Sequence, residues 1–418
     1  MTIMIAPRRM SLRLAAAFGL ALTLHGTARA EFSIPGFELV HTVPRETTLA
    51  TPDLRDAALV WKEMFDSARR EIVIGQFYVA GQDGEALDDI VAHLEAAGRR
   101  GVKIRFLMEK KGEFASVPAT IERLRRIPNL EFRQIDYARM TGNGIIHAKY
   151  FVVDGQTAFV GSQNFDWRSF SHIHETGLKI SDVAVAAQVQ AIFEIDWAAQ
   201  AAIAAGQPPA PTNRTVVAAD PKAGNYLVAS PNAFNPPGVG DSQSELVRLI
   251  GQARQEVRVQ LLDYAPLSYG PDHTRPYYAV IDDALRAAAT RGVQIKLMVS
   301  NWNTEQPAIR YLQSLALLPN VDIRIVTLPQ ASSGFIPFAR VIHTKAMSID
   351  GEVAWIGTSN WAGGYLDNSR NLEVVLHDAK MARRVAELHE QTWSSSYAQP
   401  IDVLRVYPRP AKGKPSSE

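Results

Sequence analysis

The stretch Gly144–Asn164 reads GIIHAKYFVVDGQTAFVGSQN, and a second stretch, Val341–Asn360, reads VIHTKAMSIDGEVAWIGTSN. Both fit one template, which is His, any residue, Lys, four residues, Asp, six residues, Gly, Ser or Thr, any residue and Asn. One such match can arise by chance, whereas two matches in one chain without a gap are a specific signal. We therefore interpret the rest of the chain as a scaffold that brings the two stretches face to face.

The composition is that of a globular protein. The chain has 418 residues, of which 46% are hydrophobic and 21% are charged, and it contains no cysteine. This length suggests two to three domain-sized units. The lack of cysteine excludes disulfides, thiolate metal sites and a cysteine nucleophile.

Residues 1–30 are predicted to be a cleaved signal peptide, the alternative being an uncleaved membrane anchor. An arginine-containing segment precedes the apolar run Leu14–Leu24, which is short for a bilayer span, and Ala28-Arg29-Ala30 suits a cleavage site. We expect export to the periplasm or the extracellular space, with no transmembrane segment in the mature chain. The leader carries four arginines and no acidic residue, so its removal changes the net charge from +1 to −3. A strongly basic surface for nonspecific duplex binding is therefore absent.

The remaining chain repeats one order of elements. Arg100–Met108, RGVKIRFLM, corresponds to Arg291–Val299, RGVQIKLMV, at an offset of 191 residues, and His147 corresponds to His343 at an offset of 196. A near-constant offset indicates two copies of one α/β unit. We expect a first domain over 31–206 with an irregular lead-in over 31–55, a Pro-rich linker over 207–222, a second domain over 223–400, and a C-terminal tail over 401–418 that is disordered from Pro408 onward.

Hydrophobic periodicity predicts a mixed β-sheet flanked by helices in each copy. The expected helices span 57–70, 87–99, 120–126, 183–204, 244–254, 278–291, 307–317 and 379–393. The expected strands span 71–80, 101–109, 130–135, 176–180, 256–264, 292–300, 321–326 and 371–376.

Each template stretch is predicted to be a β-hairpin. Asp154-Gly155 and Asp350-Gly351 each lie between two apolar runs, as in a two-residue turn. Such a turn pairs Val153 with Gln156, so that His147 faces Ser162. Side chains two residues apart share a face. The prediction therefore groups the following side chains on one surface: His147, Lys149, Ser162 and Asn164 in the first copy, and His343, Lys345, Thr358 and Asn360 in the second.

The turn position gives the two aspartates a different role. We interpret Asp154 and Asp350 as structural residues that cap their own loops.

The grouped side chains suit a phosphodiester. Lys149 and Lys345 can supply charge, and Asn164, Asn360, Ser162 and Thr358 can donate to the nonbridging oxygens; two histidines permit a two-step displacement through a phosphohistidine. A carboxylate on the other ring nitrogen would fix the tautomer of each imidazole. Glu175 lies 28 residues after His147, and Glu373 lies 30 residues after His343. We take these glutamates as candidate orienting residues, the alternative being surface glutamates on strands.

No metal is predicted. The imidazoles of His172 and His174 lack carboxylates at a complementary spacing, so we interpret them as surface or loop residues. Aromatic residues occur near the template stretches, and most are expected to pack in the core. Tyr78, Tyr264 and Trp361 are the candidates for substrate contact by stacking on a nucleobase.

The doubled template resembles that of the phospholipase D superfamily, over nearly all of residues 50–397. The segments Asn164–Ser169 and Ile356–Trp361 are most similar to the animal lysosomal phospholipase D-like 5′-exonucleases and the related poxvirus envelope proteins. The resemblance implies two α/β domains about a pseudo-two-fold axis, one shared site, a phosphohistidine intermediate and no cofactor. It also implies His147 as the nucleophile and His343 as the general acid and base, although the reverse assignment stays open. The animal relatives are disulfide-bonded, whereas this chain has no cysteine.

These observations lead to an exported phosphodiesterase as the expected function, with single-stranded nucleic acid ends as the lead substrate. The alternative is phospholipase D or phosphatidyltransferase activity on lipid headgroups. A degenerate binding protein is disfavoured, because every chemical position is filled in both copies. The oligomeric state is left open.

Overall fold

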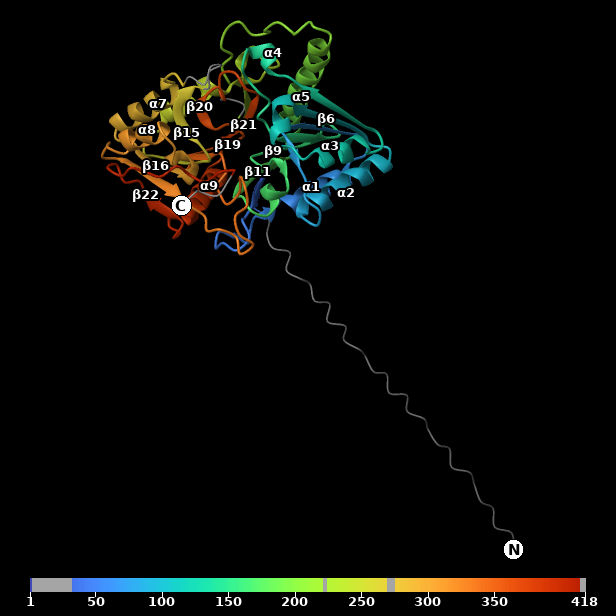
Figure 1. Cartoon of the computed structure of the whole chain (residues 1–418), viewed down its shortest axis with the longest axis horizontal. Helices are drawn as coiled ribbons and strands as arrows, with labels where there is room; N and C mark the ends of the chain where they lie inside the picture. The colour runs from blue at the N-terminus through green and yellow to red at the C-terminus, as the bar shows by residue number, and fades with distance from the viewer. Residues whose placement is uncertain (2–31, 221–223, 269–274, 414–418) are drawn as a thin grey trace. The chain divides into compact units, whose positions relative to one another are not determined.

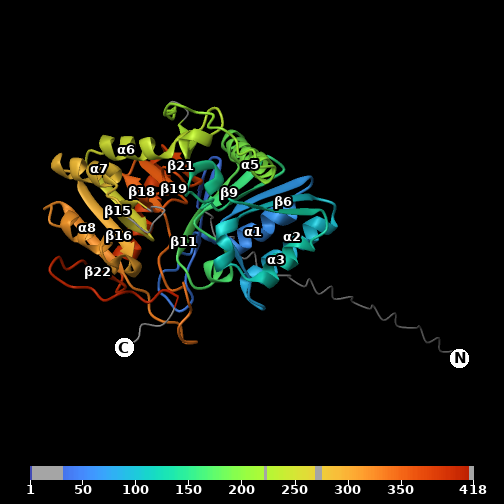
Figure 2. The same cartoon turned by 45° about the horizontal axis from the view of Figure 1, so that its top comes forward.

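The computed structural model describes Met1 and residues 32–220, 224–268 and 275–413. Except for Met1, the predicted signal peptide lies outside the described residues. Residues 31–418 form one compact unit, in which two β-sheets lie side by side (Figures 1 and 2). No helix among the described residues is long and apolar enough to cross a membrane.

The first sheet is mixed and is built by the first half of the chain. Its strand order is β1-β2-β11-β9-β8-β4-β6-β7, and β3 pairs with β2. The strands are β1 (Ser33–Ile34), β2 (Phe37–Thr42), β3 (Arg55–Asp56), β4 (Glu71–Gln76), β6 (Lys103–Glu109), β7 (Leu130–Ile135), β8 (Tyr150–Val153), β9 (Thr157–Gly161) and β11 (Glu175–Ile180).

The second sheet repeats this arrangement. Its order is β13-β12-β21-β19-β18-β14-β16-β17-β22. The strands are β12 (Asn225–Ser230), β13 (Gly240–Asp241), β14 (Glu256–Leu261), β16 (Gln294–Ser300), β17 (Val321–Val326), β18 (Ala346–Ile349), β19 (Val353–Gly357), β21 (Asn371–Leu376) and β22 (Ala398–Pro400). The common order from β2 to β7 and from β12 to β17 confirms the predicted α/β class with two similar mixed sheets.

Helices flank both sheets close to the predicted positions. They are α1 (Ala57–Ser67), α2 (Ala86–Arg99), α3 (Pro118–Arg125), α4 (Ala138–Thr141), α5 (Val183–Ala204), α6 (Ser242–Gln252), α7 (Ala279–Thr290), α8 (Ala308–Leu315) and α9 (Ala379–Trp393). Two short parallel pairs lie beside the sheets, β5 (Val79–Ala80) with β10 (Phe165–Asp166) and β15 (Tyr264–Ser268) with β20 (Trp361–Gly363).

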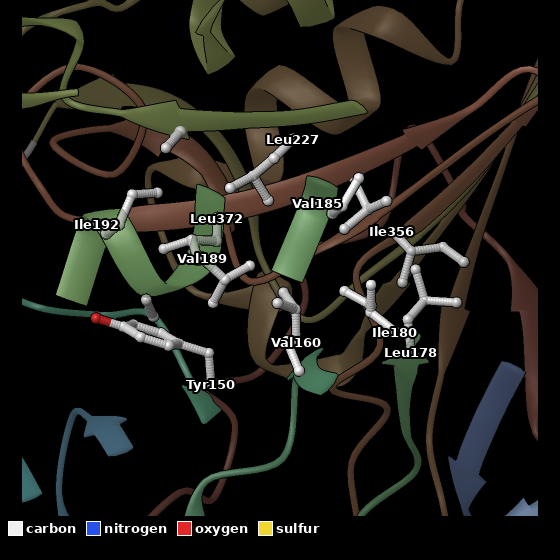
Figure 3. Close-up of a cluster of buried hydrophobic side chains, with 14 of the residues drawn as sticks. Tyr150, Val160, Leu178, Ile180, Val185, Val189, Ile192, Leu227, Ile356 and Leu372 are labelled. Atoms are coloured by element: carbon white, nitrogen blue, oxygen red, sulfur yellow. The ribbon is translucent and has the colours of Figure 1, made fainter. Parts of the chain in front are cut away.

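The two halves share a hydrophobic core. Helix α5 packs Val185, Val189 and Ile192 into a cluster that contains Val160 of the first sheet and Leu372 of the second (Figure 3). Burial of apolar area across the junction holds the halves together, at roughly 25 cal/mol per Å² removed from water. Strands β9, β11, β19 and β21 therefore lie in the middle of the molecule, and the template stretches lie with them.

The predicted irregular lead-in is wrong. Residues 31–55 contain β2, which is buried at all six positions and pairs with β11. The strand was not predicted because its polar residues interrupt the apolar pattern that is typical of a buried strand. Glu38 accepts two hydrogen bonds from Arg55, at 2.6 and 2.8 Å, and His41 is paired with Thr51, so polar side chains are tolerated there.

The predicted hairpin register is wrong by one residue. Val153 pairs with Thr157, and Ile349 pairs with Val353, so three residues form each loop. Asp154 and Gly155 have φ values of 55° and 68°, and Asp350 and Gly351 have nearly the same pair. A one-residue shift exchanges the faces of a strand. The side chains of His147 and Ser162 therefore do not form the predicted cross-strand pair.

Candidate active site

Each His-x-Lys segment is fixed by the other half of the chain. The amides of His147 and Ala148 donate to the carbonyl oxygen of Arg370, at 3.0 and 2.9 Å. In the same way, the amides of His343 and Thr344 donate to the carbonyl oxygen of His174, at 2.8 and 3.1 Å. These reciprocal contacts are those expected of a pseudo-two-fold axis that passes between the two segments.

The imidazole partners are also exchanged between the halves. His147 Nδ1 lies 3.0 Å from Asn371 Oδ1, and His343 Nδ1 lies 2.7 Å from Glu175 Oε2. Asn371 Nδ2 donates to Tyr365 O at 3.0 Å, which identifies Oδ1 as the atom that faces His147. Because an amide oxygen only accepts, His147 Nδ1 carries the proton and Nε2 presents a lone pair.

Glu175 is thus placed to orient a histidine, as predicted, although that histidine belongs to the other half, and the prediction for Glu373 is wrong. Glu175 contacts His343, in the other half, and does not contact His147. Glu373 contacts neither histidine, because its carboxylate accepts hydrogen bonds from Ser242 and Ser359. Asn371 was missed, although it lies at the same offset from Glu175, 196 residues, that separates the two histidines. Applying the motif offset, rather than matching residue types, would have found it.

The two lysines are buried next to the histidines. Lys149 and Lys345 are 1% and 0% exposed, and the Nζ atom of each donates to the carbonyl oxygen of its neighbouring histidine. Burial lowers the pKa of Lys345 to about 7, although the charge of Glu175 opposes this shift. Burial also lowers the pKa of Lys149 well below its usual value, and Lys345 adds to the effect. A bound anion would supply a counter-charge to these lysines.

Burial and the neighbouring lysines lower the pKa of His147 well below its usual value. The same causes lower the pKa of His343, whereas burial raises the pKa of Glu175 to about 7. At neutral pH, His147 is therefore an uncharged imidazole. His343 and Glu175 form a coupled pair that can hold a proton between them.

The two asparagines and the two hydroxyl residues of the template have different positions. Asn164 and Asn360 line the same cavity as His147 and His343, and their Oδ1 atoms are buried without a hydrogen-bond partner among the described residues. Ser162 Oγ instead donates to Thr176 O at 3.1 Å, and Thr358 Oγ1 donates to Asn371 Oδ1 at 2.9 Å. The asparagines thus line the cavity, whereas the hydroxyls hold the supporting strands, so the predicted phosphate contacts of Ser162 and Thr358 are wrong.

The template aspartates and glycines are structural. Asp154 accepts from the amides of Arg69, Arg70 and Glu71 at 2.7–2.9 Å, so it caps the start of β4 and not its own loop. Asp350 makes the equivalent three bonds ahead of β14. A Cβ atom on Gly161 would lie 2.8 Å from Gly177 Cα, so glycine is required where β9 approaches β11.

A cavity of about 440 Å³ contains both histidines and both asparagines. Six aromatic side chains line it, namely Phe77, Tyr78, Phe114, Trp302, Phe338 and Tyr365. Of the three predicted substrate-contacting aromatics, Tyr78 is in this wall. The other two predictions are wrong, because Tyr264 is buried with its hydroxyl on Asp282 at 2.6 Å, and Trp361 is buried against Trp355.

His172 and His174 lie in the loop that precedes β11, as one of the two predicted readings has it, but they are not surface residues, because both side chains are buried. Across the described residues, no group of three or more His, Cys, Asp or Glu side chains could hold a metal ion.

Comparison with known proteins identifies the class of this arrangement. The family model described as "Cardiolipin synthase, PLD-like domain" matches residues 61–197 and 246–393, so the chain belongs to the phospholipase D family of phosphodiesterases. Phospholipase D Z of Dictyostelium discoideum is 31% identical over 82% of this chain and 85% of its own length.

The chain is also similar to a curated exonuclease and, in its fold, to a solved structure. The 5′-3′ exonuclease PLD4 of Mus musculus is 28% identical over 91% of this chain and 82% of its own length, in line with the predicted similarity to the animal exonuclease branch. The crystal structure of phosphatidylserine synthase from Haemophilus influenzae Rd KW20 has the same fold, with a TM-score of 0.54 and 12% identity over 82% of this chain and 85% of that one.

Proposed function

We propose that this phosphodiesterase hydrolyses single-stranded nucleic acid from an end, through a phosphohistidine intermediate. The observation that carries the proposal is the ring of six aromatic side chains around the two histidines. Aromatic rings stack on any nucleobase, and each stacked base contributes about 1–3 kcal/mol. The 5′-3′ exonuclease activity in the name of the mouse relative supports the same substrate class.

The roles that we propose for the histidines follow from their partners. A nucleophilic imidazole must be unprotonated, and His147 faces the neutral amide of Asn371. A general acid must carry a proton at the start, and His343 forms with Glu175 a pair that can hold one between them. His147 Nε2 attacks phosphorus while His343 protonates the leaving oxygen. His343 then removes a proton from water, which attacks phosphorus and releases His147.

The remaining template residues bind the substrate. Lys149 and Lys345 neutralise the phosphate, and Asn164 and Asn360 donate to its nonbridging oxygens. All four are buried around the same site, where charge–charge interactions are screened less than in water.

Phospholipid headgroup hydrolysis is the second candidate. It is favoured by the similarity to phospholipase D Z and by the apolar wall of the cavity, where Phe77, Ile173 and Leu262 can contact a hydrocarbon chain. We propose export to the periplasm or the extracellular space for either activity.

A substrate panel separates the two candidates. The wild-type protein is incubated with single-stranded oligonucleotides that carry 5′-hydroxyl or 5′-phosphate ends, and with phosphatidylcholine and phosphatidylethanolamine vesicles. We expect nucleotides to be released, and we expect EDTA to leave the rate unchanged. Choline or ethanolamine release without nucleotide release would instead establish the lipid reaction. Activity that persists in both His147→Ala and His343→Ala would refute this site.

A further inference from the structure

The C-terminal strap, defined here as residues 401–413, runs over the second half and ends beside the cavity. Ile401 N donates to Ile323 O at 2.9 Å. The buried amide of Gln313 donates to the carbonyl oxygens of Asp402 and Arg405, at 2.9 and 2.8 Å. Thr304 Oγ1 donates to Pro408 O at 3.2 Å. The predicted disorder from Pro408 onward is therefore wrong as far as residue 413, because core side chains hold this segment.

The end of the strap fixes two aromatic residues of the cavity wall. Lys412 O accepts a hydrogen bond from Phe338 N at 2.8 Å. Lys412 Nζ lies 2.5 Å from Glu305 Oε2 and 5.8 Å from the centre of the Trp302 ring. Phe338 and Trp302 both line the cavity that contains the two histidines, with their ring centroids 6.3 Å apart. The strap thus reaches the wall of the cavity at Lys412, and the Phe338 ring also lies against Gly413.

The segment that carries Phe338 adopts an unfavourable conformation. Phe338 and Arg340 have φ values of 58° and 56°, a region that side chains other than glycine rarely occupy. Contacts from both halves hold this rim segment, residues 336–341. Arg168 Nη1 donates to Pro337 O at 2.8 Å, and Arg340 N donates to His172 O at 3.0 Å. The bond from Phe338 to the strap is the third of these contacts.

Phe338 has the exposure of a residue that binds a ligand. Its side chain is 46% exposed at the cavity, and Phe114 on the first half is 80% exposed there. Phe114 pairs with Phe77 at a centroid distance of 6.4 Å, much as Phe338 pairs with Trp302. An aromatic pair from each half therefore lines the site, and the second pair depends on the strap. Exposed aromatic rings at a phosphodiester site suit the stacking of bases.

We propose that the C-terminal strap forms part of the substrate site. It positions Phe338 so that the rings of Phe338 and Trp302 bind a base next to the scissile phosphate. Phe338 is then a specificity-determining residue, and Lys412 is a positioning residue. The inference rests on the proposed nuclease function and extends it from the phosphate to the base.

The test compares two single-stranded oligonucleotides that differ only in whether the terminal nucleotides carry a base or are abasic. The variants are a deletion of residues 412–418, Phe338→Ala and Phe338→Trp. The control is Val406→Ala, which changes a strap residue that is 74% exposed. We expect the wild type to prefer the base-bearing oligonucleotide by about tenfold in kcat/KM. The deletion and Phe338→Ala should lower the rate on the base-bearing oligonucleotide more than the rate on the abasic one and so abolish most of this preference, whereas Phe338→Trp and Val406→Ala should retain it.

The ratio of kcat/KM on the base-bearing oligonucleotide to kcat/KM on the abasic one distinguishes a loss of base binding from a loss of stability. A loss of folded protein lowers both rates equally and leaves this ratio unchanged. Equal loss on both substrates, or an unchanged preference in the deletion and in Phe338→Ala, would overturn the inference. If thermal melting shows that the deletion does not fold, Lys412→Ala replaces it. This variant keeps the backbone bond to Phe338 and removes the lysine contacts with Glu305 and Trp302, so an unchanged preference would overturn the role of Lys412 as a positioning residue. A wild type that cleaves neither oligonucleotide would refute the nuclease function itself, which a failure of the strap alone would leave intact.

Discussion

At the scale of single residues, the two histidines occupy equivalent positions and have different partners. Asn371 and Glu175 correspond to each other at the motif offset, yet one is an amide and the other is a carboxylate. This difference breaks the symmetry of the site. A carboxylate favours an imidazole that holds a proton, and an amide favours an imidazole that does not. The assignment of His147 as the nucleophile rests on this chemistry.

The assignment predicts a trapped intermediate in His343→Asn. This variant lacks the group that activates water, so the phosphohistidine forms with an activated ester but is not hydrolysed. Mass spectrometry after incubation with substrate should locate on His147 a phosphoryl group that still carries the ester group that did not leave. The reciprocal variant, His147→Asn, is the matched control and should carry no phosphate. Phosphate on His343 in that control would reverse the roles.

The Glu175 partner predicts a pH effect on catalysis. In Glu175→Gln, the imidazolium of His343 loses its adjacent negative charge, so the pKa of His343 falls. The general acid then loses its proton at a lower pH, and the alkaline limb of the kcat profile should move to lower pH. We also expect kcat to fall by about 10²-fold, the lower end of a general-acid effect. If the alkaline limb of the kcat profile of Glu175→Gln lies at the same pH as in the wild type, Glu175 has only a structural role.

At the scale of elements, neighbouring strands place the side chains that the hairpins alone do not. Strands β11 and β21 lie beside the hairpins β8–β9 and β18–β19, and Glu175 and Asn371 are their first residues. The predicted face sharing within one hairpin fails because the loop has one more residue than expected. The groups still converge, because each His-x-Lys segment precedes its strand and bonds to the opposite half.

The packing of β21 against α6 predicts that stability depends on pH. Burial raises the pKa of Glu373 from 4.5 to about 7. The folded state therefore retains a proton that the unfolded chain releases between these two values. In this window the free energy of unfolding falls as pH rises, by about 3 kcal/mol for this group. The loss is complete above about pH 7.

Glu373→Gln tests this dependence, because glutamine keeps the shape of the side chain and cannot ionise. Urea unfolding at pH 4.5 and pH 7.5 should show a pH-dependent change that is smaller than that of the wild type by about this amount. The control is Glu352→Gln, at an exposed position in the neighbouring hairpin. It should show the same pH-dependent change in the free energy of unfolding as the wild type. If the free energy of unfolding of Glu373→Gln changes between the two pH values as much as that of the wild type, this carboxyl does not titrate in the window.

At the scale of the whole molecule, the two halves form one structure and one site. They share the core around α5, and the two imidazoles have partners 224 and 168 residues away in the chain. A separate half has neither the second histidine nor the correct partner for its own.

This organisation predicts that residues 31–206 and 207–418, expressed separately, are each inactive. Each fragment lacks a His-x-Lys segment and exposes half of the shared core to water. Size-exclusion chromatography and a phosphodiesterase assay check both consequences. Mixing the fragments should restore activity only if they associate. Full activity in one monomeric fragment would contradict the shared site.

The sequence by itself determined the repeat, the α/β class, most element positions and the chemical residues of the site. These features depend on local periodicity and on a template that recurs at a fixed offset. The tertiary structure decided which residues support the histidines, where the hairpin strands pair, and that Tyr264 and Trp361 lie in the core. It also decided the path of the strap. The physical reason is that the packing of two sheets sets a hydrogen-bond partner across the pseudo-two-fold axis. This packing does not appear as a periodic pattern in the sequence of either strand.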